Sequence, residues 1–233
     1  MSSINELTTL QAEIRTCRRC LEEGYWIAPG PVLSGGPAAR VMLIGQAPGI
    51  TEAQVKRPFN AGSGRRLFQW LGQAGWDETD FRARAYMTAV TKCYPGRSNS
   101  GQGDRVATPF EQALCRPWLE QELKLIEPRL LILVGGLAIK LLYPPAARLN
   151  EIIGTAAYFP LEALNDPLNF DLSQATIVTS EQGVLTGHSP AGRYIVPLPH
   201  PSGASLWPNK PENKGLIDQA LGLLAHIRTV NEL

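Results

Sequence analysis

Four short apolar runs, each followed by a turn rich in glycine or proline, predict buried β-strands. They cover residues 41–44, 85–90, 130–134 and 194–198. Apolar residues spaced three and four apart predict amphipathic helices before, between and after these strands, at residues 4–17, 64–74, 108–126 and 214–230. The alternation predicts an α/β fold of three layers, in which helices flank a central, mainly parallel sheet of four strands.

Residues 144–193 depart from this alternation. Prolines interrupt the segment repeatedly, and only residues 176–178 fit a short strand. We interpret the segment as an irregular surface excursion. Because the sequence shows no internal repeat and no linker, we expect residues 1–233 to form a single domain.

Composition narrows the class of protein. Of the 233 residues, 44% are hydrophobic, which is enough for the core of one α/β domain. The net charge of +1 gives no overall signal for nucleic acid, although arginines gather between residues 57 and 84. The sequence contains no run of 18 apolar residues and no signal-peptide pattern. We therefore expect a cytoplasmic monomer without a membrane segment.

Unusual loops follow three of the predicted strands. They are the segment Gly45-Gln46-Ala47-Pro48-Gly49, the loop that begins at Cys93, and the segment His200-Pro201-Ser202. Ligands of open α/β sheets bind outside the carboxyl ends of the strands. We expect these loops to meet at one edge of the sheet and to form one site.

The chain has four cysteines, Cys17, Cys20, Cys93 and Cys115. In a reducing compartment cysteines are more often metal ligands or free thiols than disulfides. Two residues separate Cys17 from Cys20, so this pair can bind one metal centre from a single turn. Ligation by cysteine alone suits either a [4Fe–4S] cluster or a structural zinc, and the spacing does not choose between them.

Phe59 and His200 each allow a structural and a functional interpretation. Phe59 follows a proline, precedes small residues and lies outside any helical periodicity. It is either a plug for the core or a platform for a flat ligand. His200 lies between Pro199 and Pro201, which fix the backbone and so help to aim a side chain.

Together these segments resemble a known family. The loop at residues 45–49, Pro58-Phe59 and His200-Pro201-Ser202 look like the two signature motifs and the stacking aromatic of the uracil-DNA glycosylase superfamily. The cysteine layout resembles the iron–sulfur type called family 4 and is similar to the related family 5. The resemblance covers about residues 17–142 and resumes at residue 194.

The resemblance implies a DNA glycosylase that flips a damaged base into a pocket and hydrolyses its N-glycosidic bond. Gly45, Gln46 and Ala47 would hold the base and position water. Phe59 would stack on the flipped pyrimidine. His200 would stabilise negative charge on the departing base, and His200 and Gln46 are therefore the candidate catalytic residues.

The same resemblance implies how DNA and the metal centre are bound. Ser202, Gly203 and Ser205 would approach the DNA, and Leu206 or Trp207 would fill the gap left by the flipped base. A structural [4Fe–4S] cluster on the four cysteines would hold the loop at residues 96–106. Arg97 and Arg105 of this loop would then meet the DNA backbone.

Three positions depart from the family pattern. Family 4 usually has glutamate where this chain has Gln46, and some other families have Asp or Asn at Ala47. Ala89 replaces the asparagine that reads uracil, which predicts weaker selection among deaminated bases. The loop after Cys93 contains no histidine, which argues against the variant that links itself covalently to DNA. The alternative hypothesis is a non-catalytic or weakly active DNA-binding protein that retains the fold and the cluster.

Overall fold

The computed structural model describes residues 3–99, 103–164, 170–179, 184, 189, 191–203 and 205–233. The elements follow one another as α1 (Ser3–Thr16), α2 (Arg19–Glu22), β1 (Val41–Gly45), α3 (Ile50–Val55), α4 (Gly62–Gln73), α5 (Glu78–Arg84), β2 (Tyr86–Ala89), α6 (Pro109–Ile126), β3 (Leu130–Val134), α7 (Gly136–Ile139), α8 (Leu149–Ile152), β4 (Ala156–Phe159), β5 (Thr176–Val178), β6 (Arg193–Leu198) and α10 (Pro211–Val230). Short 3₁₀ turns cover Leu161–Ala163, Leu172–Gln174 and Trp207–Asn209.

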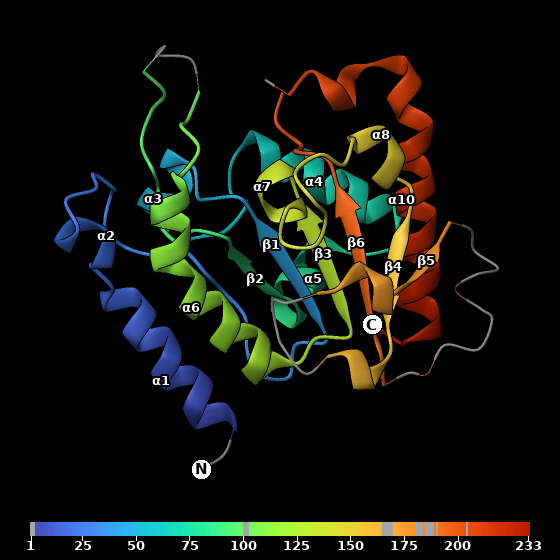
Figure 1. The fold of residues 1–233 in the computed structure, drawn as a ribbon, viewed down its shortest axis with the longest axis horizontal. Coiled ribbons are helices and arrows are strands. Elements are labelled where there is room, and N and C mark those ends of the chain that lie inside the picture. The colour runs from blue at the N-terminus through green and yellow to red at the C-terminus, as the bar shows by residue number, and fades with distance from the viewer. Residues whose placement is uncertain are drawn as a thin grey trace.

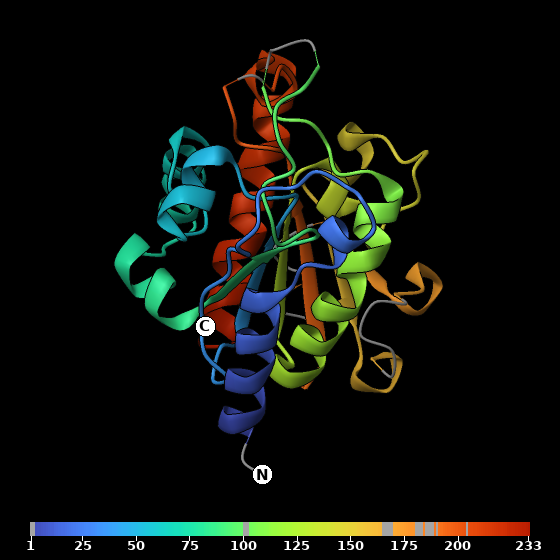
Figure 2. The same cartoon turned by 90° about the vertical axis from the view of Figure 1, so that its left-hand side faces the viewer.

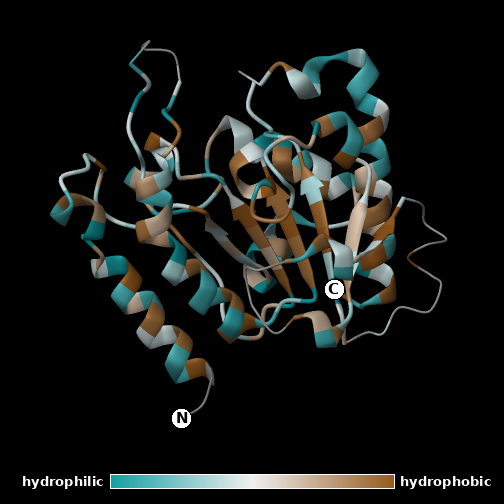
Figure 3. Cartoon of the chain, viewed as in Figure 1, coloured by the Kyte–Doolittle hydropathy of each residue, from teal (hydrophilic) through white to brown (hydrophobic). Residues whose placement is uncertain are grey.

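Within the described residues the strands form one sheet of six, in the order β2-β1-β3-β6-β4-β5. β2, β1, β3 and β6 run parallel to their neighbours. β4 pairs antiparallel with β6 and with β5. Every residue of β1 and β3 is buried, and both strands are apolar along their length (Figure 3). Strands covered on both faces by helices have this pattern.

Helices cover both faces of the sheet (Figures 1 and 2). α1 packs along α6 on one side, and α4 packs against α10 on the other. The apolar stripes of these helices meet the sheet through fully buried residues such as Ile14, Leu71, Leu123 and Leu224. The predicted three-layer α/β fold with a mainly parallel sheet is therefore confirmed.

The strand count differs from the sequence prediction, because four strands were expected and six are found. Residues 144–193 supply the two additional strands and are thus not only an irregular excursion. Residues 176–178 form β5 as expected, whereas β4 had no sequence signal. Ala156 and Ala157 begin β4, and alanine is depleted in strands, so the hydrophobic pattern did not indicate one. The rest of this segment lies partly outside the described residues.

The parallel strands end at one edge of the sheet. β1 lies between β2 and β3, so the chain leaves β1 toward one neighbour and later returns to the other. Such a reversal is a topological switch point, and the crevice beside it is the usual ligand site of an open α/β sheet. Among the helices in the described part of the chain, none is long and apolar enough to cross a membrane.

Candidate active site

A narrow pocket of about 40 Å³ opens where the parallel strands end. All residues that the sequence assigned to base binding line it, namely Gly45, Gln46, Ala47, Phe59, Ala89 and His200. A wider groove of about 430 Å³ adjoins the pocket and shares Gln46, Ala47, Pro48 and His200 with it. The structure thus brings the predicted pocket residues together and connects them to a groove on the surface.

Phe59 is held in an unusual backbone conformation, with φ at 51°. Its N–H donates to the carboxylate of Glu52, and its carbonyl accepts a 2.9 Å hydrogen bond from Arg82. Gly64 packs so closely that a Cβ there would lie 1.9 Å from the Phe59 carbonyl oxygen. The ring lies over Gly45, where a Cβ would come within 2.9 Å of it. Phe59 is only half-buried and faces the pocket, which fits a platform for a flat ligand better than a plug for the core.

His200 is fixed in one tautomer by the residue two positions along. The backbone N–H of Ser202 donates to Nδ1 of His200 at 3.3 Å, and the Ser202 hydroxyl lies 2.9 Å from the same atom. Because Nδ1 accepts a backbone hydrogen bond, the proton of the neutral ring is on Nε2. Burial lowers the pKa of His200 below its ordinary value of 6.5. The imidazole is therefore neutral at pH 7 and has one N–H to donate.

Gln46 is oriented by the start of α7. Its Oε1 accepts a 3.0 Å hydrogen bond from the backbone N–H of Leu137. This assigns the carbonyl end of the side chain and leaves the NH₂ group as the end that can donate to a ligand. Gly135, at the end of β3, has φ at 88°, and a Cβ there would lie 2.9 Å from Gln46 and 3.0 Å from His200. Only glycine lets these two side chains approach so closely.

The floor of the pocket is supported by a buried ion pair. Ala89 pairs with Gly45 across β2 and β1, and its methyl group offers no hydrogen bond to a ligand. Its carbonyl accepts a 2.7 Å hydrogen bond from Lys92 Nζ, which also lies 2.7 Å from the carboxylate of Glu122. Both charged side chains are at most 1% exposed, and Tyr86 donates to Glu122 at 2.9 Å. The pair connects the end of β2 to helix α6.

The segment after His200 lies along the groove. Ser202 and Ser205 line the groove, while Gly203 is exposed and accepts a hydrogen bond from Asn209. Leu206 is 76% exposed, whereas Trp207 packs against the core. Leu206 and Trp207 were the two residues considered for filling the gap in DNA. Only the exposed side chain of Leu206 can project into that gap.

The two loop arginines occupy different environments. The two terminal nitrogens of Arg105, Nη1 and Nη2, donate to the buried carboxylate of Glu111 at 2.7 and 2.6 Å. Nη2 also donates to the Trp26 carbonyl. This pairing holds the pKa of Glu111 below its ordinary value. Arg97 is exposed, and its backbone bridges to Asp104 across the loop. Arg105 thus anchors the loop to the start of α6, and Arg97 is the more accessible of the two.

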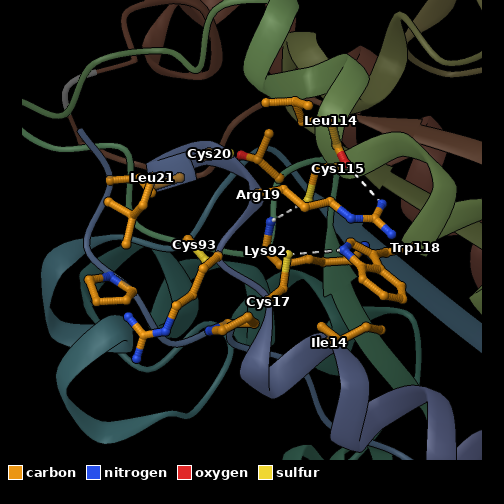
Figure 4. Close-up of a pocket in the computed structure, with 15 residues that line it drawn as sticks. Ile14, Cys17, Arg19, Cys20, Leu21, Lys92, Cys93, Leu114, Cys115 and Trp118 are labelled. Carbon is orange, nitrogen blue, oxygen red and sulfur yellow. Dashed lines mark hydrogen bonds between the residues drawn. The ribbon is translucent and has the colours of Figure 1, made fainter. Parts of the chain in front are cut away.

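A second pocket brings all four cysteines together (Figure 4). Cys17 and Cys20 come from the end of α1 and from α2, Cys93 follows β2, and Cys115 is on α6. The indole N–H of Trp118 lies 3.2 Å from the Cys17 sulfur, and the backbone N–H of Lys92 lies 3.3 Å from the Cys115 sulfur. N–H donors directed at sulfur suit thiolates that bind a metal centre.

The thiols raise one another's pKa. Burial is the largest cause and the neighbouring cysteines add to it, so that the pKa of Cys20 is about 11 and that of Cys93 about 12. A bound cation would reverse this preference, because thiolates are its ligands. Throughout the described residues, no three His, Cys, Asp or Glu side chains converge closely enough to hold a single metal ion.

Three site residues escaped the sequence analysis. Gly135 and Gly64 matter through close approach, which depends on contacts distant in the sequence. Glu52 lines the pocket and accepts N–H groups from Gly49 and Phe59. One sequence signal was available for Glu52, because it lies three residues after Gly49, the spacing of a capping box at the start of α3.

These features define a class of protein. A narrow pocket at the switch point of a parallel sheet, with an aromatic wall and a neutral histidine that donates one N–H, is built to bind a flat polar ring. The model of the uracil DNA glycosylase superfamily matches residues 34–224 of the chain. The chain belongs to this superfamily. The match begins after Cys17 and Cys20.

Curated relatives include the type-4 uracil-DNA glycosylases of Sulfurisphaera tokodaii and Pyrobaculum aerophilum. The first is 26% identical over 60% of this chain and 59% of its own length. The second is 28% identical over 64% of this chain and 70% of its own length. A type-5 uracil-DNA glycosylase from Thermus thermophilus is 34% identical over 52% of this chain and 56% of its own length. The chain thus matches roughly three fifths of the length of these relatives.

Proposed function

We propose that this protein hydrolyses the N-glycosidic bond of uracil, and of other deaminated bases, in DNA. The observation that carries the proposal is the placement of the β1 loop, Phe59 and a neutral His200 around one pocket that opens into a groove. A base that stays stacked in a duplex cannot enter a pocket between Phe59 and His200, so the target nucleotide must be flipped out. The names of the relatives, which are uracil-DNA glycosylases, support uracil as a substrate.

The pocket residues have separate roles in binding the base and in stabilising its charge. Phe59 stacks on the ring of the base, at the position fixed by Glu52 and Arg82. The Nε2–H of His200 donates to a carbonyl oxygen of the base and stabilises the negative charge that develops as the bond breaks. The NH₂ group of Gln46 provides a second donor. Because the imidazole is already neutral, it stabilises the leaving base by hydrogen bonding rather than as a cation.

The groove residues bind the DNA around the flipped nucleotide. Ser202, Gly203 and Ser205 approach the phosphates with small side chains and backbone groups. Leu206 enters the space that the base has left. Arg97 contributes a positive charge to the backbone contact. One copy of the chain carries every residue in this scheme, so the proposed reaction needs no second subunit.

Ala89 favours a broad choice of base. A site rejects a wrong base most strongly when that base leaves a buried polar group unpaired. The methyl group of Ala89 has no hydrogen-bonding group that a base could leave unpaired. We therefore expect the excision rates of uracil, hypoxanthine and xanthine to differ less than they would with an amide at this position. The residual preference comes from the donors of His200 and Gln46.

The four cysteines fit a [4Fe–4S] cluster. Structural zinc requires four sulfurs at about 2.3 Å from one point, whereas each cysteine of a four-iron cluster binds a different iron. The shared pocket, together with a cysteine layout that resembles the iron–sulfur type, supports the cluster. When bound, the cluster supplies a rigid link between α1, the end of β2 and α6. It takes no part in the chemistry on the base.

A cleavage assay on a panel of bases tests the proposed activity. Purified protein is incubated with duplex oligonucleotides that contain uracil, hypoxanthine or xanthine, and alkali then cuts each abasic site. We expect cleavage of the uracil strand and slower cleavage of the other two. Phe59→Ala should reduce cleavage of all three, because they share the stacking platform, while Phe110→Ala, an exposed aromatic on α6, serves as the matched control.

A second candidate function is lesion binding without catalysis. Gln46, Ala47 and Ala89 favour it, because all three positions lack an acid or a base. Binding of uracil DNA that exceeds binding of normal DNA, without release of any base and without an effect of His200→Ala, would support this candidate over the glycosylase.

A further inference from the structure

Two carboxylates face the proposed site of reaction. Among the described residues, Glu52 is the only acidic side chain that lines the base pocket, and Asp104 is the only one that lines the adjoining groove. Both lie close to Gly49, because a Cβ on this glycine would be 3.4 Å from an oxygen of each. Since Gln46 and Ala47 cannot remove a proton, one of these carboxylates is needed if water is to be activated.

The carboxylate of Glu52 is hydrogen-bonded to backbone groups around the pocket. Its carboxylate accepts the backbone N–H groups of Gly49, Phe59 and Asn60. These bonds join the β1 loop to the stacking aromatic and take three of the roughly four acceptor positions of the carboxylate. Glu52 therefore positions the pocket, and its removal would displace Phe59.

Asp104 has the opposite environment. Its Oδ1 accepts a 3.0 Å hydrogen bond from the hydroxyl of Tyr94, which is buried. No hydrogen bond to Oδ2 is found in the part of the chain that the structure describes. The backbone bridge between Asp104 and Arg97 fixes the position of the main chain. A carboxylate with one oriented oxygen and one that faces the groove has the geometry of a general base.

The charge of Asp104 does not favour DNA binding. A carboxylate in a groove that receives DNA phosphates repels them and lowers the affinity for DNA. Tyr94 is neutral, so it orients Asp104 without cancelling this charge. The other titratable or charged groups around Asp104 are Glu52, Arg97, Arg105 and His200. Arg105 is paired with Glu111 and His200 is neutral, so neither of them cancels the negative charge that Asp104 brings to the groove.

We propose that Asp104 is the general base that activates the hydrolytic water, an inference that rests on the proposed glycosylase function. The C1′–N bond breaks, and its electron pair goes to the base, whose charge His200 stabilises. A water oxygen forms the new bond to C1′, and one proton of this water passes to the Asp104 carboxylate. The proton later leaves to solvent and the base anion takes one up, so the products are the free base and an abasic deoxyribose.

Single-turnover kinetics of Asp104→Asn with saturating protein test this role. General-base catalysis contributes roughly 10²- to 10⁴-fold, so we expect the rate of uracil excision to fall by about 100-fold or more. The affinity for DNA should stay equal or rise, because a repulsive charge is removed. Asp80→Asn, a partly exposed carboxylate on α5, is the control and should behave as wild type.

Chemical rescue separates a base from a structural residue. Formate should restore part of the activity of Asp104→Ala, because it can occupy the vacated volume and accept the proton. It should leave His200→Ala unchanged. The inference is overturned if the wild type excises uracil and Asp104→Asn stays within threefold of its rate, or if formate does not restore activity to Asp104→Ala. Inactivity of the wild-type protein on every base would instead overturn the glycosylase proposal, and this inference with it.

Discussion

Gly135 decides how closely the two catalytic candidates can approach. Its φ of 88° lies in a region that residues with a side chain rarely adopt, and a Cβ there would meet both Gln46 and His200. We expect Gly135→Ala to destabilise the fold by about 1–3 kcal/mol and to lower excision further by moving His200. Gly136→Ala is a matched control, because a Cβ at the next position meets nothing within 4 Å. Urea unfolding of both variants gives the comparison, and equal stability of the two would contradict the close-packing account.

The ionisation of His200 gives a second prediction. Burial lowers its pKa in the folded protein below the ordinary value of 6.5, so the unfolded chain binds more protons between these two values. Stability should therefore fall as the pH falls below 6.5, until the lower pKa of the folded state is reached. His200→Gln should lose less stability than wild type between pH 7.5 and 5.5 in denaturant titrations. An NMR titration that placed the pKa of His200 above 6.5 would contradict the assignment of a neutral donor.

At the scale of elements, the buried pair of Lys92 and Glu122 connects β2 to α6. Removing one partner of a buried pair leaves the other charge without compensation, which costs about 3–5 kcal/mol. We expect this loss of unfolding free energy for Glu122→Gln. Glu120→Gln, on the same helix, breaks only a surface pair with Arg116 and should change the stability by less than about 1 kcal/mol. Similar values for the two variants would show that the pair does not stabilise the junction.

The parallel strands and the long helices that flank them were predictable from local patterns, whereas α3, which carries Glu52, was not expected as a helix. Val41–Ile44 and Leu130–Val134 are apolar without interruption, and Thr108 with Glu111 forms the expected capping box. β4 was not predictable, because its alanines acquire their strand conformation by pairing with β6 rather than from their own propensity.

The site was predictable as a set of loops but not in its contacts. The shared edge of parallel strands brings the loops of Gly45 and His200 together, and the alternation of strands and helices in the sequence predicted that these strands are parallel. The bond from Phe59 to Glu52 spans 7 positions, and Gly135 approaches Gln46 and His200, which are 89 and 65 positions away; no local pattern encodes these contacts. The same holds for Asp104, whose position depends on Tyr94 and on the two sides of its loop.

At the scale of the whole molecule, the cysteine pocket joins the N-terminal helices to the sheet and to α6 (Figures 1 and 4). Protein purified without oxygen should be brown and should contain about four irons per chain, as expected for four thiolates around a [4Fe–4S] cluster. Cys115→Ser should lose the colour and unfold at a lower temperature, because the cluster would link the N-terminal helices to the end of β2 and to α6. Colourless protein with one zinc per chain would contradict the cluster assignment.

The release of free uracil is the most direct test of the central claim, that the pocket excises a flipped base. Mass spectrometry would measure free uracil and the abasic strand after incubation of wild-type protein and of His200→Ala with a uracil duplex. The account predicts equal amounts of the two products from wild type, and a rate roughly 10²- to 10³-fold lower for His200→Ala, the loss typical of one charge-stabilising donor. Binding of the duplex without any release of uracil, or release that is unchanged in His200→Ala, would contradict it.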